Sequence, residues 1–152
     1  MIVSIREAKE SDLNAILALE NKYFKQPWKE SDWIYELTKN PINKVFVIED
    51  KNIFGFIDFM ITFNSATISQ IVIDESHQHK GYAQQLLSSM ESVFSKEGDD
   101  IVETVTLEVR ESNNSAINLY KKNGYEVITK KIHYYQDGED AIYMVKRLLL
   151  CH

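Results

Sequence analysis

A short polar segment stands where a strand is expected to turn into a helix. Gln78-His79-Lys80-Gly81-Tyr82-Ala83 follows the β-rich run Ile68–Ile73, and apolar residues then recur at spacings of three and four. The first N–H groups of a helix lack intrahelical partners and carry partial positive charge, so this junction predicts a phosphate site. Gly81 would keep side-chain bulk away from the bound group. The alternative is an ordinary strand-to-helix turn, because the segment matches neither the P-loop nor the dinucleotide-binding fingerprint.

Two more side chains could carry out proton transfer. Glu108 falls within the expected strand Val102–Val109, where polar and apolar residues alternate and where Glu is disfavoured. It is either a surface residue, solvated or adjacent to Arg110, or a general base facing a cleft. Tyr120 lies on the apolar face of the helix expected from Asn113 to Lys122. It is either a core aromatic with a locally satisfied hydroxyl or a proton donor.

The rest of the chain must supply the elements that position these groups. Strands are expected at residues 1–8, 44–49, 53–63, 66–73, 102–109, 125–135 and 141–149, and helices at about 11–24, 29–39, 83–94 and 113–122. Polar residues 95–100, with Gly98, are expected to end the third helix, and residues 136–139 are expected to form a hairpin turn. This order predicts an α/β or α+β fold, a mixed sheet with helices on its faces.

Composition narrows the class of protein. The 152 residues, 44% of them hydrophobic, predict one globular domain over 1–152, and the net charge of −6 argues against general nucleic-acid binding. The N-terminus lacks the pattern of a signal peptide and no apolar stretch has the length of a membrane span, so a cytoplasmic location is expected. Cys151 is the only cysteine and is expected to be an incidental thiol. No histidine has metal-ligand spacing, so no metal is expected.

These motifs together resemble the GNAT family of N-acetyltransferases. The resemblance is carried by Gln78-x-x-Gly81-x-Ala83 and by Leu107-Glu108-Val109-Arg110-x-Ser112-Asn113-x-x-Ala116-Ile117-x-Leu119-Tyr120-x-x-x-Gly124-Tyr125. Pro27-Trp28 and the run Tyr134-Tyr135-x-x-Gly138-Glu139-Asp140-Ala141-x-x-Met144 are similar to the RimI-type ribosomal-protein-alanine N-acetyltransferases. The resemblance spans nearly the whole chain and implies a mixed, mostly antiparallel sheet with helices on both faces.

The resemblance implies acetyl-CoA as the co-substrate. Backbone groups of Ile71, Val72 and Ile73 would pair with the pantetheine arm. The pyrophosphate would be held by the segment His79, Lys80, Gly81, Tyr82, Ala83 and Gln84 through its N–H groups, and Asn113 would contact the cofactor at the start of its helix. The chain departs from the family at Ala83, where Gly is frequent, and at His79, where Arg is common.

The resemblance also implies catalytic roles, with Glu108 as general base and Tyr120 as the acid that protonates the departing CoA thiolate. An α-amino group has a reference pKa of roughly 7.7–8.0, so a base is needed to make it nucleophilic near neutral pH. The acceptor is expected to bind between the region of Trp28 and a hairpin that carries Tyr134, Tyr135, Glu139 and Asp140. The alternative for the two hairpin tyrosines is that they cover a sheet edge.

The expected function is therefore acetyl-CoA-dependent acetylation of a protein N-terminal α-amine, with the N-terminal alanine of a ribosomal protein as the expected acceptor. An acetyltransferase for a small amine or for another protein is the alternative within the enzyme class. A non-catalytic acyl-CoA-binding module is a third hypothesis, which the joint presence of Glu108 and Tyr120 disfavours. The oligomeric state stays open.

Overall fold

The computed structural model describes residues 2–94 and 102–148. Its strands are β1 (Ser4–Glu7), β2 (Asn43–Glu49), β3 (Ile53–Thr62), β4 (Ser65–Ile73), β5 (Thr104–Arg110), β6 (Glu126–Lys131) and β7 (Ala141–Arg147). Its helices are α1 (Leu13–Tyr23), α2 (Glu30–Thr38), α3 (Tyr82–Phe94) and α4 (Asn114–Lys122), with short 3-10 turns at Glu10–Asp12 and Glu75–His77. The predicted order of strands and helices is confirmed. The expected helix stop at Gly98 and the thiol of Cys151 lie outside the described residues.

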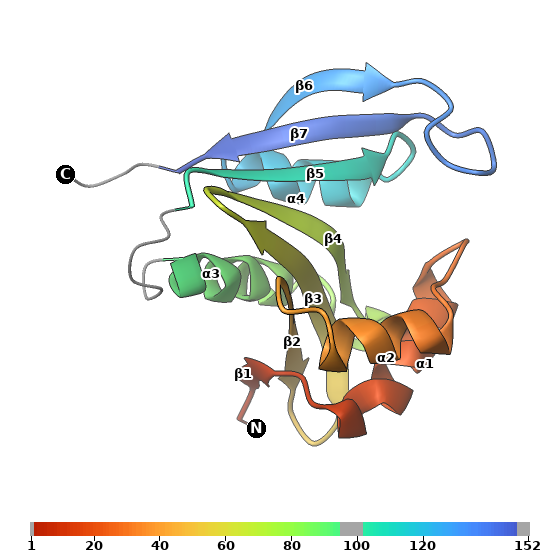
Figure 1. Cartoon of the computed structure of the whole chain (residues 1–152), viewed down its shortest axis with the longest axis vertical. Coiled ribbons are helices and arrows are strands. Elements are labelled where there is room, and N and C mark those ends of the chain that lie inside the picture. The colour runs from red at the N-terminus through yellow and green to blue at the C-terminus, as the bar shows by residue number, and fades with distance from the viewer. Residues whose placement is uncertain (1, 95–101, 149–152) are drawn as a thin grey trace.

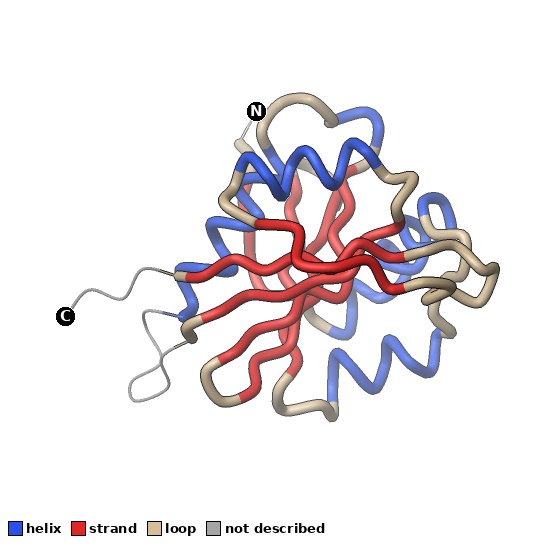
Figure 2. Tube along the Cα trace, turned by 90° about the horizontal axis from the view of Figure 1, so that it is seen from above, coloured by secondary structure: helices blue, strands red, loops and turns tan. Residues whose placement is uncertain are grey.

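The described strands form one mixed sheet in the order β1-β2-β3-β4-β5-β7-β6. Each neighbouring pair is antiparallel except β4 and β5, which run parallel because α3 crosses over between them. Helices cover both faces of this sheet (Figures 1 and 2). The expected fold class, a mixed and mostly antiparallel sheet with helices on both faces, is confirmed.

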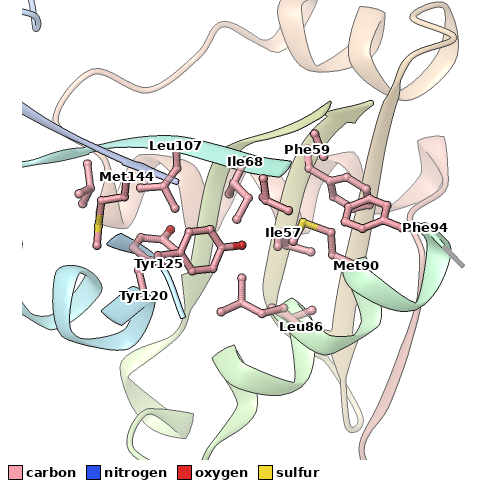
Figure 3. Packing of buried hydrophobic residues seen from close by; sticks show 14 of the residues in the cluster. Ile57, Phe59, Ile68, Leu86, Met90, Phe94, Leu107, Tyr120, Tyr125 and Met144 are labelled. Atoms are coloured by element: carbon pink, nitrogen blue, oxygen red, sulfur yellow. The ribbon is translucent and has the colours of Figure 1, made fainter. Parts of the chain in front are cut away.

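Each face of the sheet has its own hydrophobic core. On one face, α3 and α4 bury their apolar stripes against β3, β4 and β5 (Figure 3). The residues of that core labelled in Figure 3 include Leu86, Met90 and Phe94 of α3, Leu107 of β5 and Tyr120 of α4. On the other face, α1 and α2 cover β2 and β3 through a smaller cluster around Trp33, which is fully buried. The sheet therefore separates a side covered by α3 and α4 from a side covered by α1 and α2.

The parallel strands β4 and β5 separate partway along their length. They pair only from Ser65 with Thr104 to Ile68 with Leu107, after which each continues beside its other neighbour (Figure 1). The separation begins at a β-bulge, since Phe59 of β3 pairs with Ile68 and the preceding Asp58 pairs with Gln70, leaving one residue of β4 unmatched. From Gln70 to Ile73, β4 has no strand partner on the side of the gap, and the Ile73 carbonyl accepts a hydrogen bond from the Gln78 Nε2 at 2.9 Å.

The last hairpin differs from the prediction. The strand expected at 125–135 is wrong in extent, because β6 ends at Lys131 and residues 132–140 form a loop. His133 has a φ of 53°, which breaks the extended backbone, and a turn closes where the Gly138 N–H donates to the Tyr135 carbonyl. Tyr134 and Tyr135 consequently lie in the β6–β7 loop (residues 132–140) and do not face along a sheet edge.

Candidate active site

A cavity of about 760 Å³ lies between the end of β4, the start of α3 and α4, within the range of small-molecule sites. Of the residues expected to bind cofactor, all but Lys80 line it: Ile71, Val72, Ile73, His79, Gly81, Tyr82, Ala83, Gln84 and Asn113. The opposite wall comes from α4 and from Tyr23 and Phe24 at the end of α1. A long ligand can therefore lie in this cavity beside the unpaired edge of β4, where its amides would find backbone partners.

The mouth of the cavity is built to hold an anion. Gln85 N–H donates to the Gly81 carbonyl, and the preceding amides of Tyr82, Ala83 and Gln84 have no backbone acceptor among residues 2–94 and 102–148. The loop before them turns through two left-handed residues, with φ of 64° at His79 and 84° at Gly81. Left-handed residues at these two positions direct successive backbone N–H groups toward one concave surface. Free amides, a helix dipole and a concave loop together fit a pyrophosphate.

Gly81 meets a second structural requirement, besides the expected one of leaving room for a bound group. A Cβ placed on this residue meets nothing within 4 Å, whereas its φ of 84° is one that L side chains rarely adopt. Backbone conformation within the protein therefore requires glycine here, and the space in front stays open for a ligand.

The start of α4 is defined by a side-chain cap. The Asn113 Oδ1 accepts a hydrogen bond from the Ala116 N–H at 3.2 Å, so Asn113 is the N-cap of α4. Asn113 also lines the cavity, so the same residue that begins α4 lies where the cofactor is expected.

The end of α4 sets the position of Tyr120. Tyr125 N–H donates to the Tyr120 carbonyl, Gly124 N–H donates to the Lys121 carbonyl, and Gly124 has a φ of 93°. This is a Schellman motif, which brings the two flanking side chains together. The ring centroids of Tyr120 and Tyr125 lie 5.4 Å apart, and both side chains are labelled in Figure 3. Burial raises the pKa of the Tyr120 phenol, and the neighbouring Tyr135 adds to the shift. Tyr120 is therefore protonated at physiological pH, as a proton donor must be.

Glu108 points to the other face of the sheet. It sits on β5 opposite Tyr143 of β7, and its Oε1 accepts from the Nζ of Lys131 at 2.7 Å. Its side chain is 22% exposed, so the carboxylate is sheltered without being sealed from solvent. Glu108 pairs with Lys131 and not with Arg110, whose guanidinium is engaged with the β6–β7 loop.

The β6–β7 loop is organised by the two carboxylates expected to bind substrate. Glu139 accepts from the Ser112 N–H at 2.9 Å and from Arg110 at 3.0 Å, and Asp140 accepts from the His133 N–H at 2.8 Å. Bonds from Ser112 and then from Arg110 lower the pKa of Glu139 to about 2. Both carboxylates thus hold the loop in shape, whatever else they contact.

The two tyrosines of this loop differ in environment. The Cζ of Arg110 lies 4.1 Å from the centroid of the Tyr135 ring. Burial raises the pKa of Tyr135 to about 12, and the charge of Glu108 also raises it. Tyr134 is 49% exposed and packs edge-to-face on Tyr135 at 5.0 Å. Tyr134 is therefore the one with a ring surface available to a further molecule.

Trp28 belongs to a second loop, between α1 and α2, that reaches the same region. Its backbone N–H donates to the Glu20 Oε1 at 2.8 Å, and the centroid of its ring lies 5.0 Å from that of Trp33. The Lys25 Nζ of this loop lies 3.7 Å from the Glu139 Oε1. The α1–α2 loop and the β6–β7 loop consequently lie side by side (Figure 1).

Sequence reasoning missed several residues of this site. Lys131 is the partner of Glu108, and Gln70 donates to the buried carboxylate of Glu20 at 2.9 Å. Burial raises the pKa of Glu20. No local signal distinguishes Lys131 from the neighbouring Lys130, because the contact with Glu108 depends on the order of strands in the sheet.

Metal-binding clusters and helices that could span a membrane are both absent from the described residues. Within residues 2–94 and 102–148, no cluster of His, Cys, Asp and Glu side chains could hold a metal ion. None of the helices described above is long and apolar enough to span a membrane.

Comparison with known proteins identifies the family. A model of the acetyltransferase (GNAT) family matches residues 13–125. Over 143 residues the chain is 32% identical to a putative ribosomal protein bS18-alanine N-acetyltransferase of Bacillus subtilis (strain 168), with 93% of each chain covered. It is 30% identical over 144 residues to the ribosomal protein bS18-alanine N-acetyltransferase of Escherichia coli (strain K12), covering 93% of this chain and 95% of the relative.

The fold agrees with that relationship. The crystal structure of the ribosomal-protein-S18-alanine N-acetyltransferase from Escherichia coli superposes with a TM-score of 0.86 at 28% identity, covering 99% of this chain and 97% of that one. Since the family model matches most of its length, the chain belongs to the GNAT acetyltransferase family and is an acetyl-CoA-dependent N-acetyltransferase.

Proposed function

We propose that this enzyme acetylates the N-terminal α-amine of a protein, with the N-terminal alanine of ribosomal protein bS18 as the acceptor. The observation that carries the proposal is the similarity, over 93% of the chain, to relatives named for that reaction. The site supports it, because two loops bearing Trp28 and Tyr134 flank the face of the sheet on which Glu108 lies. An extended peptide can enter between such loops, with its terminal amine beside the carboxylate. Ribosomal proteins are made in the cytoplasm, where the enzyme would act.

The cofactor would occupy the cavity between β4, the start of α3 and α4. Its phosphates would be held by the free amides at the start of α3, and its arm would lie along the unpaired edge from Gln70 to Ile73. Acetyl-CoA, when bound, supplies the thioester carbonyl that the acceptor amine attacks. The expected cofactor residues other than Lys80 converge on this cavity, which supports the assignment.

Proton transfer would be divided between the two faces of the sheet. Glu108 would take the proton that the amine loses as the new C–N bond forms, and Tyr120 would give its proton to the sulfur as the C–S bond breaks. Tyr120 belongs to the core on the side of the sheet covered by α3 and α4, whereas Glu108 on β5 points to the opposite side. Before the next cycle, Glu108 would release its proton to solvent and Tyr120 would regain a proton from solvent.

A competition assay tests the acceptor class. The enzyme is incubated with labelled acetyl-CoA and an Ala-starting peptide with the bS18 N-terminal sequence, the same peptide with a blocked N-terminus and a free lysine, and spermidine. We expect the free α-amine peptide to have the highest kcat/KM. If spermidine or the lysine peptide is the better acceptor, the protein N-terminal proposal fails and the small-amine or lysine alternative replaces it.

A variant links the acceptor to the β6–β7 loop. Tyr134→Ala should raise the peptide KM by roughly 5- to 30-fold, because an exposed aromatic contact contributes about 1–2 kcal/mol, while the acetyl-CoA KM stays within about twofold. Ile132→Ala is the matched control, since Ile132 is an exposed apolar residue of the same loop. Equal effects of the two substitutions would place the peptide elsewhere.

A further inference from the structure

Lys131 reaches its partner across a whole strand. It starts on the edge strand β6, and its ammonium ends at 2.7 Å from Glu108 on β5, with β7 between them (Figure 1). On the way, its Nζ lies 4.7 Å from the ring centroid of Tyr143 and 5.4 Å from that of Tyr134. Two aromatic faces and one carboxylate therefore define the position of a single ammonium group.

This arrangement differs from an ordinary surface ion pair. The adjacent Lys130 also pairs with a carboxylate, that of Glu111, but the side chains of that pair are 44% and 46% exposed. In the Lys131–Glu108 pair the exposures are 39% and 22%. Exposed pairs are worth about 0–1 kcal/mol and leave both side chains mobile, whereas here the aromatic contacts restrain the lysine and the lysine restrains the carboxylate.

Only one oxygen of Glu108 is engaged. Oε1 accepts from Lys131, and Oε2 has no hydrogen-bond partner among residues 2–94 and 102–148. Hydrogen bonding to Glu108 raises the pKa of Lys131, so the lysine stays a cation beside the carboxylate. Other cations near this face are used differently: Arg110 binds Asp137 and Glu139, and Lys25 faces Glu139. The orientation of the free oxygen thus depends on Lys131.

We propose that Lys131 is a positioning residue for the acetyl-transfer reaction, holding one oxygen of Glu108 so that the other faces the acceptor amine. This inference rests on the proposed role of Glu108 as general base. A base must lie within hydrogen-bond reach of the proton it removes, and a misplacement of about 1 Å can cost on the order of 100-fold in rate. Tyr134 and Tyr143 contribute by restraining the lysine.

The test compares four variants by steady-state kinetics with an Ala-starting peptide. Lys131→Met keeps the length and apolar body of the side chain and removes its charge, and it should lower kcat by about 10- to 100-fold with the acetyl-CoA KM unchanged. Lys131→Arg restores a donor to Glu108 and should recover most of the rate. Lys130→Met is the matched control and should behave as wild type. Glu108→Gln provides the reference in which the base is removed.

A double-mutant cycle separates this inference from the proposed function. If Lys131 acts through Glu108, Lys131→Met should change the residual single-turnover rate of Glu108→Gln by less than about twofold. Independent losses that multiply would overturn the proposal, as would a higher kcat/KM in Lys131→Met, which would mean that the lysine competes with the acceptor amine. Full activity of Glu108→Gln would remove the general-base assignment itself. A low rate for Glu108→Gln with normal Lys131→Met kinetics would overturn only the role of Lys131.

Discussion

Replacing Gln84 by Glu tests the phosphate site with little change of shape. Gln84 is exposed in the first turn of α3 and lines the cavity. The substitution is isosteric and places a negative charge where the free amides and the helix dipole favour an anion. In the free enzyme it should stabilise the helix by about 0.3–1 kcal/mol, so weaker cofactor binding could not be blamed on unfolding.

The size of the effect follows from Coulomb's law. For a phosphate charge at roughly 6 Å, repulsion is about 0.7 kcal/mol at the dielectric constant of water and about 2.8 kcal/mol at an effective value of 20. Because Gln84 is exposed, the lower half of this range applies, which corresponds to a Kd for CoA raised by roughly 3- to 20-fold. Salt should shrink the difference, since the charges lie near solvent.

Isothermal titration calorimetry with CoA, at low and at high salt, measures this change. Gln85→Glu is the matched control, because it adds the same charge one residue later at an exposed position outside the cavity lining. We expect its Kd to stay within about twofold of wild type. Equal weakening by both substitutions would reveal only a general charge effect, and no weakening by Gln84→Glu would show that the phosphates bind away from the start of α3.

Two further predictions concern buried groups. Tyr120→Phe should lower kcat by about 10²–10⁴-fold and leave the CoA Kd unchanged; retention of full kcat would refute its role as acid. Burial raises the pKa of Asp58 to about 7 from 3.8, so the unfolded chain loses its proton first and stability should fall by up to about 4 kcal/mol as pH rises from 4 to 7. The free energy of unfolding, measured with urea at each pH, should fall with pH over this range, and Asp58→Asn should reduce that pH dependence. The same pH dependence in both proteins would refute the raised pKa of Asp58.

Local sequence determined the parts of the site that depend on neighbours along the chain. Asn113 caps α4 and Asn123-Gly124 ends it, because a side-chain acceptor and a left-handed glycine satisfy helix ends through contacts only a few residues long. The junction at Gly81 follows the same logic, since a strand, a turn and an amphipathic helix are consecutive. These rules predicted the phosphate site at this junction and the order of elements, whereas the cofactor roles of Ile71–Ile73 and Asn113 came from the family resemblance.

Tertiary structure decided what depends on strand pairing. The bulge in β4 and its separation from β5 arise from register, which alternation of residue types does not reveal. The shortening of β6 at Lys131 placed Tyr134 in a loop, although the preceding residues are as β-rich as a longer strand requires. Short-range propensity carries no information on which loop will pack beside which.

The partner of Glu108 in the folded sheet is the clearest case of a contact that local sequence does not reveal. Its position on the polar face of a strand was evident from alternation, yet its partner is a lysine two strands away in the sheet. Lys130 and Lys131 are indistinguishable by type and spacing, and only the pleat of β6 and the order β5-β7-β6 direct one of them toward the carboxylate. Sequence alone therefore determined which groups could do the chemistry, while the non-local pairing of strands decided how they are held, because an ion pair across a sheet depends on distances that the chain acquires only when it folds.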